Sequence, residues 1–238
     1  MFYKYISINS ANAKEQTDRI INSITNDELF FADWRKFNDI GEGSFCIDPS
    51  DVLWSTDFEK CTDELKERII GQKKSYSILC STTNNTHALM WALYASEHQG
   101  ICIGFTPSNK MRRINVNYSR LVPCVRPKPF IEISDVDMDN VVEEILGTKS
   151  VDFSSESEVR FLLREPPGCK AVSIREVYFG CKINQQIKSG ILEACRNKSL
   201  DLYDSLKLQN SYSLERKPIK LESFQRDNSP SRFECEDP

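Results

Sequence analysis

Short runs of apolar, aromatic and β-branched residues, each about as long as one strand, set the main limit on how this chain folds. Such runs are typical of β-strands that are at least half buried. None approaches the roughly 20 apolar residues that a membrane-spanning helix needs. The runs are FYKYISI from residue 2, SYSILCS from residue 75, ICIGF from residue 101, SEVRFLLRE from residue 157 and AVSIREVYFG from residue 171.

Segments with the apolar spacing of helices separate these runs, and Ile20, Ile21 and Ile24 give the first example. The last two strands are joined by EPPGCK, which cannot continue a ladder. The pattern therefore predicts an α+β fold with a split antiparallel sheet flanked by helices. The other predicted helices lie over residues 49–74, 87–99, 135–146 and 183–197, with Gly100 as the C-terminal stop of the second of these.

The length of 238 residues suits one large domain, and the polar composition near the C-terminus marks where that domain ends. We expect a single catalytic-like domain over residues 1–205 and a polar tail over residues 206–238, which is rich in proline, serine and mixed charge. Trp91, Phe105, Phe161 and Phe179 lie on the apolar sides of predicted elements and should be buried against one another.

Charge and cysteine usage bound the compartment and the partners. The net charge of −4 lacks the basic excess of a general nucleic-acid coat. The N-terminus has no apolar run of signal-peptide type, and we therefore expect a cytoplasmic protein with no membrane contact. The nine cysteines are scattered without Cys-x-x-Cys spacing, which favours reduced thiols. Only two histidines are present, neither at a zinc-ligand spacing, so no metal site is predicted.

Four segments, taken in order, resemble the bacterial family known as domain of unknown function 2971. They are YKY, the FNDIGE turn, CSTTNNTHALMWALYASEHQG, and TKSVDFSSESEVRFLL followed by IREVYFG. The resemblance covers about residues 3–185. It is carried most specifically by Ser81, Met90, Trp91, Tyr94, His98 and Gly100, and then by Lys149, Glu156, Glu158 and Arg160.

The order of three short motifs is also similar to that of mono-ADP-ribosyltransferases of the Arg-Ser-Glu type. Lys4 stands where those proteins have a basic residue on the first strand, Ser81-Thr82-Thr83 follows, and Glu156-Ser157-Glu158 comes last. This resemblance implies an ADP-ribosyltransferase-like fold and NAD as a substrate. It also implies a bacterial toxin or anti-phage effector that modifies a protein or nucleic acid acceptor and has an antitoxin or sensor partner.

The chemistry of NAD cleavage assigns a role to each motif residue. Glu158 would stabilise the positive charge that develops on the ribose, and Glu156 would orient or deprotonate the acceptor. Ser81 would fix the ribose, Lys4 would bind the cofactor from the first strand, and Tyr3 or Tyr5 would stack on an aromatic ring. If Glu156, Glu158 and Arg160 alternate along one strand, they share a face, with the two carboxylates within about 7 Å.

Three other interpretations remain open. A Glu-x-Glu-x-Arg face is also typical of a solvated strand in which Arg160 pairs with a glutamate. The same pocket with water as acceptor would make an NAD glycohydrolase. A protein without catalysis could sense a nucleotide or a phage protein. The transferase hypothesis requires Ser81 and Glu158 to lie on neighbouring central strands and face one cleft, whereas His98 is expected to cap a helix as a charged imidazolium.

Overall fold

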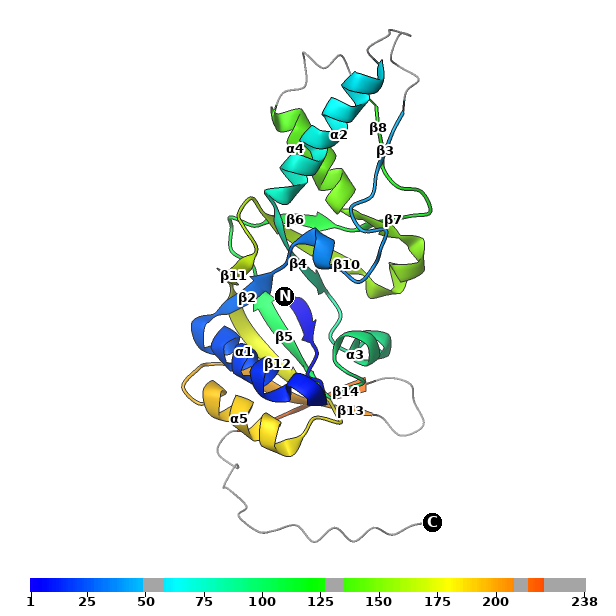
Figure 1. Cartoon of the computed structure of the whole chain (residues 1–238). Coiled ribbons are helices and arrows are strands. Elements are labelled where there is room, and N and C mark those ends of the chain that lie inside the picture. Colours follow the sequence, from blue (N-terminus) through cyan, green and yellow to red (C-terminus); the bar gives the residue numbers. More distant parts are fainter. Residues whose placement is uncertain (49–57, 127–134, 208–213, 221–238) are drawn as a thin grey trace.

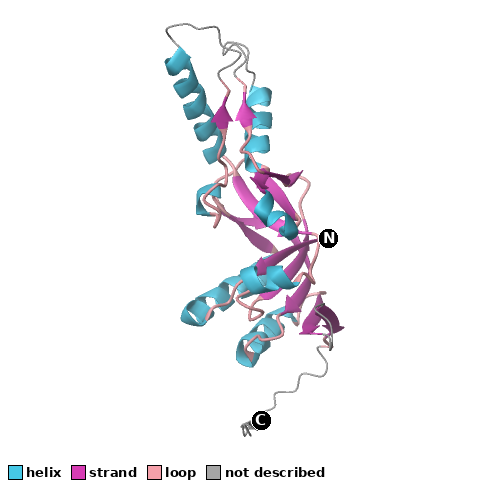
Figure 2. Ribbon diagram, turned by 90° about the vertical axis from the view of Figure 1, so that its right-hand side faces the viewer, coloured by secondary structure: helices cyan, strands magenta, loops and turns pink. Residues whose placement is uncertain are grey.

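The computed structural model describes residues 1–48, 58–126, 135–207 and 214–220. These form an elongated molecule with one large sheet in its middle and lower part and a helical arm above it (Figure 1). The view turned by 90° shows the same elongation (Figure 2). The α+β class predicted from the alternating patterns is confirmed. Within the described residues, no helix is long and apolar enough to cross a membrane.

The main sheet has eight strands in the order β14-β13-β12-β5-β1-β4-β10-β6. All neighbours are antiparallel except β12 and β13, which run parallel, so the sheet is mixed rather than purely antiparallel. The predicted domain boundary at residue 205 falls inside β13. The strands are β1 Phe2–Ile6, β4 Ser77–Thr82, β5 Ile101–Thr106, β6 Arg112–Asn115, β10 Glu158–Leu163, β12 Ser173–Phe179, β13 Asp201–Lys207 and β14 Leu214–Pro218.

The sheet is held together weakly between β1 and β4. The register joins these strands through the single pair Tyr3 and Thr82, whereas β1 and β5 share five pairs and β4 and β10 share six. Beyond Tyr3 the two strands diverge, and this divergence makes room for a cleft between two well-paired halves. The ADP-ribosyltransferase-like part of the fold prediction stays a prediction.

Helices cover both faces of the lower sheet. α1 (Ala13–Asn26) and α5 (Gln185–Cys195) lie on one face and bury a core that contains Phe105, Phe161 and Phe179. The short helix α3 (Ala88–Tyr94) lies on the opposite face, where Trp91 packs against Tyr5 and Tyr178. All four predicted core aromatics are buried, but Trp91 belongs to a different cluster from the three phenylalanines. The expectation that they pack together is wrong for Trp91, because the sheet separates it from them.

The arm consists of α2 (Phe58–Lys74) and α4 (Asp135–Leu146), which pack together through Leu65, Ile69 and Val142. A two-stranded parallel pair, β3 (Cys46–Ile47) and β8 (Cys124–Val125), lies beside them. Figure 2 shows this pair between the two helices. The first part of the helix predicted over 49–74 lies outside the described residues.

Two predicted boundaries differ in the structure. The helix predicted over 87–99 ends at Tyr94, because Ser96, Glu97 and His98 all adopt positive φ. Gly100 instead allows a close approach, since a Cβ there would lie 2.1 Å from the Ile6 carbonyl oxygen. The EPPGCK turn leads into a further strand, β11 (Gly168–Ala171), which pairs with β2 (Glu28–Phe31). Another short parallel pair joins β7 (Asn117–Ser119) to β9 (Thr148–Ser150).

Candidate functional site

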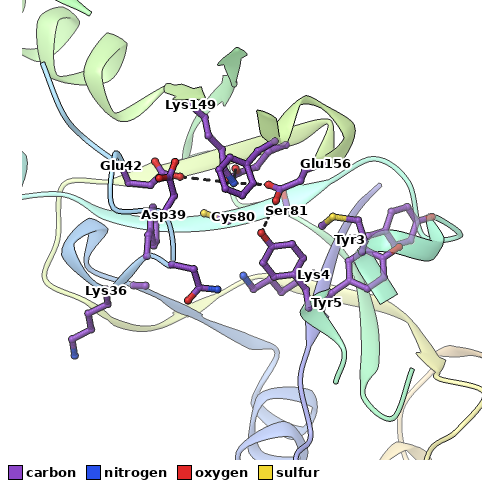
Figure 3. A pocket seen from close by; sticks show the side chains of 17 residues that line it. Tyr3, Lys4, Tyr5, Lys36, Asp39, Glu42, Cys80, Ser81, Lys149 and Glu156 are labelled. Atoms are coloured by element: carbon purple, nitrogen blue, oxygen red, sulfur yellow. Dashed lines mark hydrogen bonds and ion pairs between the residues drawn. The ribbon is translucent and has the colours of Figure 1, made fainter. Parts of the chain in front are cut away.

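A cleft of about 240 Å³ opens where β1 and β4 diverge (Figure 3). This volume is below the roughly 300–1,000 Å³ of pockets that enclose a drug-sized ligand, so it suits a small ligand or one end of a larger one. All six residues to which the sequence assigned a site role line it: Tyr3, Lys4, Tyr5, Ser81, Glu156 and Glu158. Residues far apart in the chain therefore meet at one place.

The local fold explains how these residues reach the cleft. Successive residues of β1 point to opposite faces of the sheet, yet Tyr3, Lys4 and Tyr5 all line the cleft because β1 presents an edge to it. β4 supplies Cys80 and Ser81 from the other side of the split. The segment after β2 forms a further wall, and its lining residues are Lys36, Phe37, Asn38, Asp39 and Glu42.

Glu158 lies at the start of β10 with a buried carboxylate. It accepts hydrogen bonds from Arg160 Nε at 2.9 Å and from Lys149 Nζ at 3.1 Å. Burial alone would raise the pKa of Glu158, but the charges of Arg160 and Lys149 outweigh it and hold the pKa at about 2. Glu158 is therefore ionised throughout the physiological range.

Glu156 does not share the strand face of Glu158, which corrects the predicted alternation. It ends the 3₁₀ helix η5 (Val151–Glu156), and Ser157 then adopts φ 48° before β10 begins. This turn brings the Glu156 carboxylate to Lys149, at 2.5 Å, and to the Tyr94 hydroxyl, which donates to it. The carboxylates of Glu156 and Glu158 both bind the Lys149 ammonium. In Figure 3 this ammonium lies between Glu42 and Glu156.

The polar face of β10 is buried, so it is not a solvated strand, although Arg160 does pair with a glutamate as that interpretation expected. The Arg160 side chain is 1% exposed and donates to Glu158, to Glu42 Oε1 at 2.7 Å and to the Leu146 carbonyl. Burial raises the pKa of Glu42 despite the opposing charge of Arg160. In this cluster three carboxylates face two cations, an excess of one negative charge beside the cleft when all are ionised.

Ser81 and Glu158 lie on neighbouring central strands, as the transferase hypothesis requires, and both line the cleft. Their side chains nevertheless leave the ladder on opposite faces, because Ser81 pairs with Val159 and Glu158 pairs with Thr82. The Ser81 hydroxyl donates to the Val159 carbonyl at 2.8 Å. It keeps lone pairs that can accept a hydrogen bond from a ligand.

The predicted stacking tyrosines are largely engaged by the protein. The Tyr5 hydroxyl donates to the Asn84 carbonyl and its ring meets Trp91 edge-on. The Tyr3 ring meets Tyr178 edge-on, and burial together with the charge of Glu176 raises the pKa of Tyr3 to about 12. Phe153, which is half-buried with the Lys149 ammonium 4.6 Å from its ring centroid, is another aromatic wall.

Glu42, Lys149 and Tyr94 carry much of the site's electrostatics, yet sequence analysis gave them no role. Glu42 is 118 residues from its partner Arg160, so no local spacing links them. All three residues do belong to segments that carry the family resemblance, Glu42 as the last residue of FNDIGE, but the resemblance gives none of them a chemical role.

His98 does not cap a helix as an imidazolium. Its ring stacks on Trp91 with an interplanar angle of 5°, and burial followed by the charge of Lys182 lowers the pKa of His98. Its Nδ1 is buried with no hydrogen-bond partner. Among residues 1–48, 58–126, 135–207 and 214–220, no group of three His, Cys, Asp or Glu side chains is placed to hold a metal ion.

Comparison with known proteins gives one match. Residues 90–161 match a family described as "Protein of unknown function (DUF2971)", which confirms the predicted family resemblance over this part of the chain. The matched segment runs from α3 into β10 and includes Tyr94, Lys149, Glu156, Glu158 and Arg160. No curated protein and no solved structure matched the chain.

Proposed function

We propose that this protein is an NAD-dependent ADP-ribosyltransferase whose cleft binds the nicotinamide-ribose end of NAD. The supporting observation is that Tyr3, Lys4, Tyr5, Ser81, Glu156 and Glu158, which come from three separate segments, line one cleft. The aromatic walls of the cleft suit a ring that is itself cationic, as the nicotinamide of NAD is. The rest of the dinucleotide would extend outside the 240 Å³ cleft.

In the proposed reaction, the bond between the ribose C1′ and the nicotinamide nitrogen breaks, and nicotinamide leaves with the electron pair. The ionised Glu158 stabilises the positive charge that develops on the ribose. A nucleophile of the acceptor then bonds to C1′, and its proton passes to Glu156 or to solvent. With water as the nucleophile, the same steps describe an NAD glycohydrolase. The acceptor and any antitoxin or sensor partner stay predictions.

A binding module without catalysis is the second candidate, and one observation favours it. Both carboxylates are held in ion pairs with Lys149, and Glu158 is also paired with Arg160. Such pairs fix a pocket's shape but neutralise part of the charge that would act on the ribose. A protein of this kind would recognise a nucleotide or a phage protein without turning it over.

Nicotinamide release and NAD affinity would be measured for wild type, Glu158→Gln and Glu156→Gln, each with and without extracts of bacteria and of phage-infected bacteria. Loss of Glu158 should lower release by about a hundredfold or more and change NAD affinity little, because the carboxylate acts mainly in the transition state. Glu156→Gln should suppress transfer to an acceptor more than transfer to water.

Glu15→Gln is the matched control, because Glu15 is exposed on α1 and pairs with Arg19, which is exposed as well. Circular dichroism and a melting curve would show that each variant is folded. Background-level release from every protein, with no binding of NAD, would exclude both NAD enzymes and leave the sensing module.

A further inference from the structure

Two exposed cysteines face each other in the strand pair beside the arm helices. Cys46 on β3 and Cys124 on β8 are register partners in the short parallel pair that lies beside α2 and α4 (Figures 1 and 2). Paired residues of neighbouring strands have Cα atoms about 5 Å apart, which is inside the range of about 4.4–6.8 Å that a disulfide requires. Both side chains leave the ladder on the same side, so their sulfur atoms can meet.

The two thiols already interact. A side-chain hydrogen bond with Cys46, followed by local desolvation, raises the pKa of the exposed Cys124. A raised pKa lowers the thiolate fraction at neutral pH, so oxidation should be slow there and faster in mild alkali. The raised pKa affects the rate of oxidation, whereas the geometry of the two cysteines determines how stable the disulfide is once formed.

The other described cysteines lack this arrangement. Cys80, Cys102 and Cys195 are half-buried or buried in the packed body. Cys169 is exposed but faces Phe30 across its ladder, and Cys181 is exposed just after β12. Cys169 and Cys181 therefore provide internal controls for the reactivity of an exposed thiol.

We propose that Cys46 and Cys124 form a redox-responsive pair that closes reversibly into an intramolecular disulfide. With oxidised glutathione as the oxidant, one thiolate attacks the glutathione disulfide and releases one glutathione thiolate. The second cysteine thiolate attacks the mixed disulfide and releases the other. Two thiol protons go to solvent or to the released glutathione, and two electrons reduce the oxidant.

The position of the pair connects it to the cleft. Cys46 follows Glu42 by four residues, and residues 36–42 contain the wall that lines the cleft. At its other end this wall is held by the bridge between Ala32 and Ile78. The second end is held by the backbone hydrogen bond from Cys46 to the Pro123 carbonyl and by the ion pair of Glu42 with Arg160. A covalent bond from Cys46 to Cys124 would add to these contacts and restrict the motion of the wall further. This inference is independent of which ligand the cleft binds.

The full chain would be equilibrated in buffers of increasing oxidised-to-reduced glutathione ratio, and its free thiols counted. The number should fall from nine to seven at a ratio that leaves Cys169 unmodified, and peptide mass mapping should find Cys46 linked to Cys124. Cys46→Ser and Cys124→Ser should each abolish the linked peptide, and Cys169→Ser should retain it. The oxidised protein should also be cleaved by trypsin after the exposed Lys36 at least about threefold more slowly than the reduced protein.

Glutathione adducts at Cys46 and Cys124 at the same ratio as at Cys169 and Cys181, with no linked peptide, would overturn the proposal. A linked peptide with unchanged cleavage after Lys36 would establish the disulfide and disprove its effect on the wall. The proposed NAD chemistry would fail in a different experiment, because none of these measurements uses NAD.

Discussion

Arg160 carries its positive charge into a site that is almost fully shielded from water. Its side chain is 1% exposed, and it is compensated by Glu158 and Glu42, which are 6% and 4% exposed. Buried ion pairs gain little net stability, because desolvation offsets much of the attraction, but breaking one leaves a charge without compensation. The cluster thus ties the wall segment that holds Glu42 to the strand that holds Glu158.

Arg160→Met should therefore destabilise the fold by about 3–5 kcal/mol, since it leaves two buried carboxylates without their main partner. Arg164→Met is the matched control: Arg164 follows the same strand but is 54% exposed, and its ion pair with Asp139 should contribute about 0–1 kcal/mol. Urea unfolding followed by fluorescence would measure both changes. Equal losses for the two variants would show that burial does not set the value of the Arg160 pairs.

Whether a site residue could be predicted depends on how far along the chain its interaction partners lie. Glu158 and Ser81 could be singled out because short motifs and strand patterns carry them. Glu42 ends the FNDIGE segment of the family resemblance, but its pairing with Arg160 could not be predicted, because the flanking Gly41 and Gly43 indicate only a turn and nothing local shows that the turn folds over Arg160. Glu156 was placed wrongly because Ser157 adopts a left-handed conformation and β10 begins only at Glu158, and the serine-rich segment before it gives no signal of this turn.

At the scale of elements, α3 shows where periodicity misleads. The pattern of residues 87–99 remains helical past Tyr94, but the chain leaves the helix so that Gly100 can approach the Ile6 carbonyl oxygen and β5 can begin. Tertiary contact overrides local preference there. The strands were predicted more accurately, because β4, β5, β10 and β12 each contain a run of buried apolar residues and β1 alternates buried tyrosines with half-buried residues.

Trp91 fixes α3 to the sheet, so Trp91→Ala should cost about 3–5 kcal/mol. The side chain is fully buried against Tyr5, and its Nε1 donates to the Asn85 carbonyl at 2.9 Å. Leu93→Ala on the same helix should change stability little, because Leu93 is 67% exposed. Thermal melts of both variants would test this. A small loss for Trp91→Ala would mean that α3 is anchored mainly through the turn that follows it.

The order of strands in the whole sheet could not be obtained from local patterns. β1 lies between β4 and β5, although the strand–helix–strand spacing of residues 77–106 gives no sign of an inserted strand. Pairing between distant segments depends on which edges are free when the core assembles, and this is a property of the whole chain. The cleft follows from that insertion, because β1 pairs fully with β5 and touches β4 at one point.

The stability of the whole molecule should depend on pH with two opposing contributions from the buried cluster. The folded pKa of Glu158 is about 2 against an ordinary value of 4.5, so its contribution is complete above pH 4.5. That contribution, up to about 3 kcal/mol, is lost as the pH falls from 4.5 towards 2. Glu42 has a raised pKa, so the folded state binds its proton first, and acidification from neutral pH towards 4.5 adds stability.

The buried cluster should therefore stabilise the fold most in weak acid. The free energy of unfolding would be measured by urea titration between about pH 2.5 and 8, a window that spans both shifts. Glu158→Gln should flatten the decline below pH 4.5, because the titrating carboxyl is gone. Glu42→Gln should remove the gain between neutral pH and 4.5 and leave that decline in place. If Glu158→Gln and wild type lost stability in parallel below pH 4.5, the acid transition would belong to other carboxylates, and the ion pairs of Glu158 with Arg160 and Lys149 would not govern the acid stability of the fold.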